Sequence, residues 1–508
     1  MKIGILIGKM LCTMFMVQSI SVSAQSIRFS EFHDLNQGAG GFLDVALLGN
    51  GDLLAVGNVL NLTDNVGYSD GFHVLVNAEG ELIQSNGFAS VNKSYHTQSV
   101  VKNPLTNTLF SAGYFCDFTI ESPGYCDFYI SKLDATGDTL FTKVLSRPDT
   151  SDFLLDMVQT RPNKLMLIGW TYNDTTDGNA DLLFITVDTL GNELNRVVYG
   201  GGGTDYVNSG IVVDDDGNVL MTGYTQSFGG SDNDTWVLQT DSIGNVAWHK
   251  VYNHLSPSQG DGGGGITALP DGNYAVAGDY DNASATSAYG FIMKIDSDGN
   301  ELWTKRFSDG IHKGFWACKA LATGEILACG QAFNTNDNSQ TGWLVKTDAN
   351  GDTLWTRTYN ASQFTDLLRN MIVLPNGDIV MVGFGRAPGQ TNQDGWILRV
   401  DSMGCLQEGC FSVGVKETEQ ESGYFKVYPN PFSSTTTIEY NLGRECEEGC
   451  EIRLYDLQGQ IILKEVLHNT NGVGQLTVDL SSYGNGIYYC SLYGNQQLLQ
   501  TEKLILMK

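Results

Sequence analysis

The sequence predicts an all-β protein in which a seven-bladed β-propeller is followed by a small immunoglobulin-like β-sandwich. Two repeated signals predict the propeller. The first is a four-residue turn that starts with Asn or Asp and ends with Gly, and that returns every 52 to 57 residues. Its copies start at Asn77, Asp134, Asp188, Asp241, Asp296, Asp348 and Asp401. The second is a glycine that ends an apolar stretch in the same rhythm, at Gly57, Gly113, Gly169, Gly223, Gly278, Gly330 and Gly383.

The sixth repeat shows the unit that recurs. Short apolar stretches at 315–321, 325–330, 342–348 and 352–359 are separated by turn residues, and no sustained helical period is present. The repeat therefore predicts four antiparallel strands, here named A to D, which is the blade of a propeller. A solenoid is the alternative, but its repeats are usually shorter and it needs polar capping units.

The two ends of the repeat region complement each other. Residues 26–32 resemble a strand D without strands A to C before it, whereas the seventh repeat supplies A to C over 371–401 and then degenerates. We expect the N-terminal strand to complete the seventh blade, because closure of the ring removes exposed strand edges.

The two ends of the sequence predict the localisation of the protein and the limits of its domains. Residues 1–24 resemble an export signal, since Lys2 and Lys9 flank a short apolar run and small residues precede a cleavage site near Ala24. That run is too short to span a membrane, and no later segment is long and apolar enough. We therefore predict a signal peptide at 1–24, the propeller at 25–413, a polar linker at 414–424 and a C-terminal domain at 425–508.

The charge excludes two classes of partner. The chain carries 57 acidic and 29 basic residues, a net charge of −28. A field of this sign repels phosphate backbones and anionic lipids, so we expect neither nucleic-acid binding nor docking to a membrane surface.

The cysteines suggest disulfides, because exported chains oxidise neighbouring thiols. Cys318 and Cys329 fall opposite each other if their hairpin turns around 323–324. The predicted pairs are Cys116–Cys126, Cys318–Cys329, Cys405–Cys410 and Cys446–Cys450, which leaves Cys490 over. Metal binding is the alternative, but no histidine lies near any pair.

No cofactor is expected from the motifs. The segments 214–218 and 296–300 hint at calcium, yet they lack the spacing and distal Glu of a calcium loop, and they fall where the fold needs turns. The seven histidines form no metal-ligand spacing, and no metalloprotease, nucleophile-elbow or P-loop motif occurs. Calcium remains the alternative to the absence of any cofactor.

The last eighty or so residues lose the repeat and alternate between apolar and polar positions, which predicts a small β-sandwich. Four segments of this domain, 428–432, 454–461, 486–488 and 503–508, resemble the type A sorting domain of proteins exported by the type IX secretion system of Bacteroidota. The propeller repeats also resemble those of exported proteins from these bacteria. The sorting residues implied by the resemblance are Tyr428, Pro429, Asn430, Pro431, Phe432, Gly459, Gly486, Tyr488 and Lys503.

This resemblance implies recognition by the type IX machinery at the outer membrane and release or attachment at the cell surface. The segment 446–450 departs from the family pattern as an insertion. An ordinary accessory β-sandwich is the alternative.

Loop lengths predict which face of the propeller carries function. The A–B and C–D connections are tight turns on one face, whereas the B–C and D–A connections on the other face are longer and variable, and function usually collects on such loops. The residues after the repeated glycines should lie near that face, at Asn58, Tyr114, Trp170, Tyr224, Asp279, Gln331 and Phe384. Their aromatic rings could stack on sugars or anchor a peptide, or these side chains simply pack against the next blade.

Three functions fit this organisation. The first is a surface or secreted binding module for a glycan or a protein. The second is a polysaccharide-degrading enzyme whose acidic residues meet at the mouth of the central channel. The third is a non-catalytic spacer.

Overall fold

The computed structural model describes residues 27–33, 39–60, 69–88, 92–103, 106–118, 125–147, 150–173, 179–208, 210–229, 233–253, 260–280, 289–307, 312–334, 339–360, 366–387, 392–407, 425–441, 450–456, 461–467, 473–494 and 497–508. These residues contain strands and turns but no helix. The chain divides into two compact units, residues 1–407 and 408–508. The predicted signal peptide, its cleavage site and the predicted linker lie outside the described residues.

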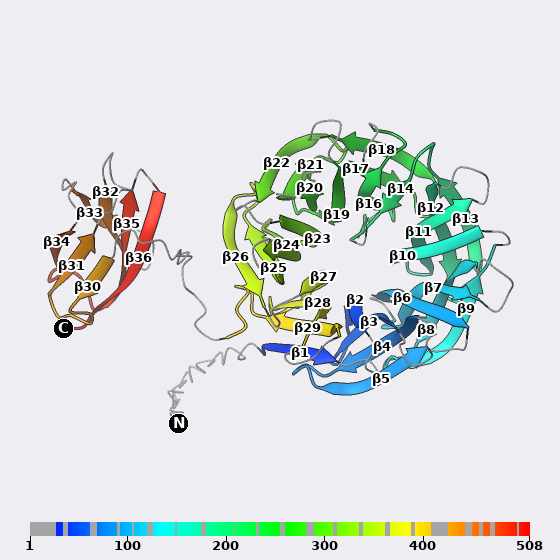
Figure 1. Ribbon diagram of the computed structural model, residues 1–508, viewed down its shortest axis with the longest axis horizontal. Coiled ribbons are helices and arrows are strands. Elements are labelled where there is room, and N and C mark those ends of the chain that lie inside the picture. Colours follow the sequence, from blue (N-terminus) through cyan, green and yellow to red (C-terminus); the bar gives the residue numbers. More distant parts are fainter. Residues whose placement is uncertain are drawn as a thin grey trace, which may run out of the picture. The chain divides into compact units, whose positions relative to one another are not determined.

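The described part of the first unit contains seven antiparallel sheets arranged in a ring (Figure 1). Blade one consists of β2 (Gly40–Leu47), β3 (Leu53–Leu60), β4 (Ser69–Val76) and β5 (Leu82–Phe88). Blade two consists of β6 (Lys93–Lys102), β7 (Leu109–Asp117), β8 (Cys126–Leu133) and β9 (Thr139–Leu145). Blade three consists of β10 (Thr150–Arg161), β11 (Lys164–Asn173), β12 (Ala180–Asp188) and β13 (Glu193–Tyr199).

The fourth blade has a divided first strand. It consists of β14 (Asp205–Val207) and β15 (Val212–Val213), which both pair with β16 (Val219–Thr225), and of β17 (Asp234–Thr240) and β18 (Val246–Tyr252). Blade five consists of β19 (Asp261–Ala268), β20 (Tyr274–Tyr280), β21 (Tyr289–Ile295) and β22 (Glu301–Phe307). Blade six consists of β23 (His312–Ala320), β24 (Ile326–Asn334), β25 (Ser339–Thr347) and β26 (Thr353–Tyr359).

The seventh blade confirms the predicted closure of the ring. Its strands β27 (Leu367–Val373), β28 (Ile379–Gly385) and β29 (Asp394–Val400) come from the end of the repeat region, and its outer strand is β1 (Phe29–His33). Strand β1 pairs antiparallel with β29, from Phe29 opposite Arg399 to His33 opposite Gly395. The side-chain hydroxyl of Ser30 accepts a hydrogen bond from the indole N–H of Trp396 at 2.9 Å.

The turns that follow strand C share one geometry in all seven blades. Each final glycine has a φ between 72° and 95°, a region that favours glycine over other residues. Its N–H donates to the carbonyl of the first turn residue, and the side chain of that residue accepts backbone N–H bonds, as Asp188 does from Leu190 and Asn192. The turn residues therefore serve geometry, as the sequence indicates.

The second repeated glycine faces an irregularity in strand A. In six blades strand A contains a β-bulge opposite this glycine, as between Thr97 and Ser99 in blade two. A Cβ atom on Gly113 would lie 1.8 Å from the carbonyl oxygen of His96. Only glycine leaves room for that carbonyl, so a glycine recurs at this position in every blade. The strand nevertheless continues beyond the glycine rather than ending there, since β7 reaches Asp117.

The second unit is a β-sandwich, as predicted. One sheet contains β30 (Phe425–Tyr428), β31 (Thr435–Asn441) and β34 (Val473–Asp479). The other contains β32 (Cys450–Tyr455), β33 (Ile461–Leu467), β35 (Gly486–Gly494) and β36 (Gln497–Leu506). Ile438 and Val478 from the first sheet share one core with Leu454, Cys490 and Leu504 from the second.

The disulfide prediction holds in part. Cys116 and Cys126 form a disulfide and face each other across β7 and β8. Cys405 and Cys450 are each half of a disulfide. Their predicted partners, Cys410 and Cys446, lie outside the described residues, as does the sorting residue Gly459.

The predicted pair between Cys318 and Cys329 is wrong, because both thiols are free and buried. The hairpin turns on three residues with Gly324 at a φ of 89°, so Cys318 lies opposite Ala328, and Cys329 lies opposite Ala317. A shift of one residue in register places two side chains on opposite faces of a sheet. Cys318 therefore packs in the core between blades five and six, and Cys329 in the core between blades six and seven.

Candidate functional site

Side chains of strand A meet at the axis of the propeller. The first strands lie nearest the centre of the ring in Figure 1. Burial raises the pKa of Tyr206 in blade four, and the charge of Arg369 in blade seven is close enough to oppose this rise. Burial likewise raises the pKa of Asp156 in blade three, and the charge of Lys319 in blade six opposes it. Because these blades are not neighbours in the ring, the charges act across the axis. All four residues are half-buried and so retain surface accessible to solvent.

A continuous series of rings, here named the aromatic arc, extends over blades two to four. Its members are His96, Tyr114, Phe153, Trp170, Tyr172, Tyr206 and Tyr224. Phe153 stacks on Trp170 with ring centroids 4.1 Å apart, and Tyr206 stacks on Tyr224 at 5.3 Å.

The aromatic arc lies toward the face of the B–C and D–A loops, because its residues occupy the start of strand A and the end of strand B. Tyr172 is 41% exposed and the other rings are half-buried. Burial lowers the pKa of His96 to about 4 and raises that of Tyr114 to about 12, so both rings are uncharged near neutral pH. The arc is a partly accessible and uncharged surface.

The arc brings together three of the residues that the sequence singles out, Tyr114, Trp170 and Tyr224. The other predicted residues lie apart from it. Phe384 packs against Gly41 of the next blade, so closely that a Cβ on this glycine would lie 2.8 Å from the phenylalanine side chain. Asp279 lies against Gly314 of the next blade.

The remaining two predicted residues make polar contacts. The side-chain oxygen of Gln331 accepts a bond from Gln340 within its own blade, and Asn58 accepts the backbone N–H of Thr97 from the next blade at 2.7 Å. These contacts fit the alternative that residues after the repeated glycines pack against neighbouring strands.

Arg369 and Trp316 occupy two of the bulges and also face the axis. The guanidinium carbon of Arg369 lies 4.3 Å from the centre of the Trp316 ring, a cation–π contact between blades seven and six. Burial lowers the pKa of Arg369, although the group remains a cation at any physiological pH.

A chain of polar side chains lies one step further along strand A. The Asn370 amide donates to Asp44 at 2.9 Å, and the hydroxyl of Ser99 lies 3.0 Å from Asp44 and 2.7 Å from Asp156. Asp44 also accepts the backbone N–H of Val100 in the next blade. These contacts join the inner strands of blades seven, one, two and three.

The two carboxyl groups of this chain share one hydroxyl proton. Ser99 can donate to only one of them, so the other contact is favourable only when that carboxyl carries a proton. Burial, together with the charge of Asp156, raises the pKa of Asp44 to about 7, and burial raises the pKa of Asp156. We therefore expect the pair to hold a proton near neutral pH.

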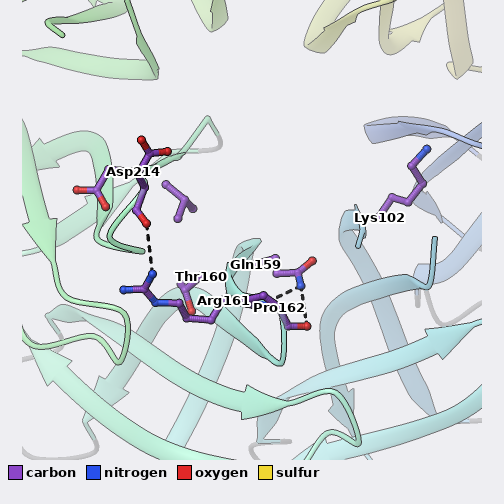
Figure 2. A pocket seen from close by; sticks show the side chains of 8 residues that line it. Lys102, Gln159, Thr160, Arg161, Pro162 and Asp214 are labelled. Atoms are coloured by element: carbon purple, nitrogen blue, oxygen red, sulfur yellow. Dashed lines mark hydrogen bonds between the residues drawn. The ribbon is translucent and has the colours of Figure 1, made fainter. Parts of the chain in front are cut away.

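A cavity of 350 Å³ lies on the opposite face, among the tight turns (Figure 2). It is lined by Lys102, Gln159, Thr160, Arg161, Pro162, Val213, Asp214 and Asp215. Its polar groups are largely occupied by their own turns, since Gln159 donates to the carbonyls of Arg161 and Pro162.

The segments with a calcium-like sequence form turns. Both carboxylate oxygens of Asp214 accept bonds from Asn218, and Asp296 bonds Asn300 in the same way. Among the described residues no group of three acidic, histidine or cysteine side chains has the arrangement of a metal site.

In the second unit, the two ends of the domain meet at the predicted sorting residues. Asn430 donates to the carbonyl of Lys503 and accepts the N–H of Ile505 at 2.8 Å. Phe432 is buried, and its N–H donates to the carbonyl of Ile505 at 3.0 Å. The segment 428–432 thus lies along the final strand.

The sorting residues of β35 pair with the same strand. Tyr488 is opposite Leu504, Gly486 is opposite Leu506, and Lys503 is opposite Tyr489. Tyr428 keeps 43% of its surface exposed, and its hydroxyl donates to Glu439 at 2.6 Å. Pro429 accepts a bond from Thr436, while Pro431 precedes the buried Phe432. Asn430, Phe432, Gly486, Tyr488 and Lys503 therefore lie on or beside β36, whereas Tyr428 and Pro429 contact β31.

Residues 426–507 match the family model described as secretion system C-terminal sorting domain. The second unit is a type IX sorting domain. A protein with this sorting domain is a client of the type IX secretion machinery and is secreted or displayed at the cell surface. In the part of the chain that the structure describes, no helix has the length and apolar character of a membrane span. No curated protein sequence matches the chain.

Solved structures that are similar to this chain include enzymes and a domain of a protease. Acylaminoacyl peptidase from Pyrococcus horikoshii is 9% identical at a TM-score of 0.41, over 79% of this chain and 57% of that one. The β-propeller domain of the Trilobed protease from Pyrococcus furiosus is 10% identical at 0.41, over 76% and 99%. Penicillium chrysogenum α-L-arabinanase complexed with arabinobiose is 13% identical at 0.39, over 74% and 97%. The chain thus spans little more than half of the first of these, and the similarities say nothing of activity.

Sequence reasoning missed Phe153, Tyr206, Trp316 and Arg369, which all lie on strand A. Phe153 and Tyr206 lie opposite the residues that follow the repeated glycines, whereas Trp316 and Arg369 are the extra residues of two bulges. Asp44, Ser99 and Asp156 were also missed. Acidic residues are numerous in this chain, and the position of a bulge in strand A cannot be read from composition.

Proposed function

We propose that the propeller is an exported binding module that holds a glycan against the aromatic arc. The observation that carries this proposal is the continuous and partly exposed series of rings across three blades, on the face of the variable loops. Sugar rings present apolar C–H faces and polar edges, so they suit aromatic side chains that also carry hydroxyl groups. Tyr114, Tyr172, Tyr206 and Tyr224 combine both.

Export supports this proposal. A type IX client acts outside the cell, where glycans and surface proteins are the available ligands. A protein ligand would use the same rings as hydrophobic anchors. The proposal favours a glycan because six of the seven rings of the arc are half-buried, whereas protein interfaces usually bury about 800 Å² on each partner.

The test is a screen of the full chain against glycan and protein arrays, followed by titration of the best ligand. Trp170→Ala and Tyr172→Ala should weaken binding by about tenfold or more, because each removes a stacking surface. Tyr274→Ala is the matched control, since this half-buried ring follows a tight turn on the opposite face. Unchanged affinity in the arc variants would place the site elsewhere, and silence on both arrays would favour the spacer.

A polysaccharide-degrading enzyme is the second candidate, and one observation favours it. Asp44 and Asp156 are close at the axis and have raised pKa values, as paired catalytic carboxyl groups often do. Against this stands the occupation of Asp44 by Val45, Ser99, Val100 and Asn370, which leaves little of the carboxylate for a substrate. Hydrolysis of a bound glycan that Asp44→Asn abolishes without loss of binding would establish the enzyme.

A further inference from the structure

Arg369 is a cation at the axis of the propeller without a carboxylate partner. Among the described residues it forms no ion pair and no hydrogen bond, and its one specific contact is the ring of Trp316. It is also the one charged residue among those left unpaired by the six bulges, the others being Leu43, Gln98, Leu155, Gly264 and Trp316.

Such an arrangement is suited to a ligand. A half-buried cation has lost part of its hydration without gaining a counterion, and a bound anion would supply one. A contact with the face of an indole ring uses none of the five N–H donors of a guanidinium, so those donors remain available to a ligand. Donors in this fork match the two oxygens of a carboxylate or the oxygens of a sulfate.

We propose that Arg369 and Trp316 form an anion subsite for one acidic sugar residue of the glycan that the aromatic arc binds. This rests on the proposed function and narrows its ligand class. Tyr206 connects the two, since it belongs to the arc and lies close enough to Arg369 to feel its charge. The ligand would thus stack on blades two to four and place its acidic group toward blades six and seven.

The charge of the whole chain limits how acidic this ligand is. A net charge of −28 repels a polyanion at long range. Lys319, a second cation near the axis, is already close enough to Asp156 to act on its charge. One guanidinium therefore suits a glycan with an isolated uronate or a single sulfate ester, and not a densely sulfated chain.

The experiment uses a glycan array that carries each backbone as a neutral, a uronate-bearing and a singly sulfated version. We expect the wild-type chain to prefer an acidic version by about tenfold or more, as one charge-assisted contact predicts. Arg369→Gln should bind the neutral and acidic versions equally, and Arg369→Lys should keep part of the preference. Arg161→Gln, an exposed arginine on the opposite face, is the matched control and should bind as the wild type does.

Folding of the variants is checked by thermal unfolding. A structural arginine would lower the melting temperature when it is replaced, whereas loss of an unpaired cation should leave it unchanged or raise it. The comparison of uronate with sulfate shows which acid is recognised. An acidic preference that survives in Arg369→Gln, or a wild type that prefers neutral versions, overturns the subsite while the binding function stands.

A second readout separates failure of the subsite from failure of the binding function. If no glycan binds the array, the proposed function fails, and the subsite is tested by titrating glucuronate and sulfate against the tryptophan fluorescence of the wild type and of Arg369→Gln. Quenching that depends on Arg369 supports the subsite. Its absence overturns the subsite independently of the array.

Discussion

The repeated glycine of strand B is needed for the inner architecture because it faces the bulge of strand A. In every blade a Cβ at this position would lie about 2 Å from a strand A carbonyl oxygen, closer than atoms can approach. The bulge in turn brings Arg369 and Trp316 toward the axis. One residue type without a side chain therefore decides where functional side chains of the opposite strand lie.

Gly113→Ala should destabilise the propeller strongly. Its new Cβ would lie 1.8 Å from the oxygen of His96, so β6 must shift, at a cost of about 3 kcal/mol or more in the free energy of unfolding. Urea unfolding followed by tryptophan fluorescence measures this. Gly87→Ala is the control, because nothing lies within 4 Å of its Cβ, and equal midpoints for the two variants would contradict the close-approach explanation.

The free cysteines allow a second prediction at this scale. Burial raises the pKa of Cys318 to about 12 and also raises the pKa values of Cys329 and Cys490, so none is a reactive thiolate in the folded protein. Iodoacetamide should leave these three residues unlabelled in the folded protein and label them once the protein is denatured. If no reductant is added, Cys116 and Cys126 should stay unlabelled because they form a disulfide. Peptide mass spectrometry reads the labels, and a disulfide-linked peptide containing Cys318 and Cys329 would show that the register is different.

Strand β1 is the element on which closure of the ring depends. Phe29 fills the space beside Gly80 and belongs to the core between blades seven and one. Arg28 adds an ion pair with Asp401 at 2.8 Å, and Ser30 holds Trp396. Without this strand, β29 would be an exposed edge.

Phe29→Ala should cost about 3–5 kcal/mol of unfolding free energy, because it removes a buried ring from this core. Differential scanning calorimetry of the full chain measures the effect on the propeller transition. Glu31→Ala, exposed on the same strand, should leave the transition unchanged. If both variants melt as the wild type does, β1 contributes little to the closed ring.

Elements were more predictable from the sequence than the site that they form. The turns at Asp134 or Asp348 could be recognised because a side-chain acceptor and a glycine at fixed spacing suffice for the geometry. The sorting residues could be recognised because their order along the chain is typical of the family. The error at Cys318 and Cys329 came from a turn of three residues, where composition does not fix the register.

The site itself depends on contacts across the ring, which no local pattern records. Tyr206 and Arg369 are far apart in the sequence, yet the charge of Arg369 acts on Tyr206 because blades four and seven face the same axis. The positions after the repeated glycines include Trp170 and Tyr114, which the structure places in the aromatic arc, but they could not show that Asp279 and Phe384 lie apart from it.

At the scale of the whole molecule, two groups of carboxyls respond to pH in opposite directions. The turn aspartates, such as Asp188 and Asp296, have lowered pKa values because they accept backbone and side-chain bonds, although burial opposes this at Asp188. Their contribution is present at neutral pH and is lost as the pH falls through their lowered pKa values in the folded state. Asp44 behaves in the reverse way, since its pKa is raised from 3.8 to about 7.

Between about pH 4 and pH 7 the folded chain holds a proton on the pair of Asp44 and Asp156 that the unfolded chain has released. The free energy of unfolding should therefore fall as the pH rises through this window, by at most about 1.4 kcal/mol per pH unit for each proton. Thermal unfolding between pH 3 and pH 9 should show a maximum near the lower end of the window and a decline on both sides.

Asp44→Asn should flatten the decline toward pH 7 and leave the acid side unchanged, because the turn aspartates are intact. Its stability should be lower at every pH, since the amide cannot accept all the bonds that Asp44 accepts from Val100 and Asn370. Asp216→Asn, an exposed turn residue, is the control and should keep the wild-type profile. If the stability of Asp44→Asn falls above pH 4 as steeply as that of the wild type, the shared proton lies elsewhere. The hydrogen bonds through Ser99 would then join the inner strands without making stability depend on pH.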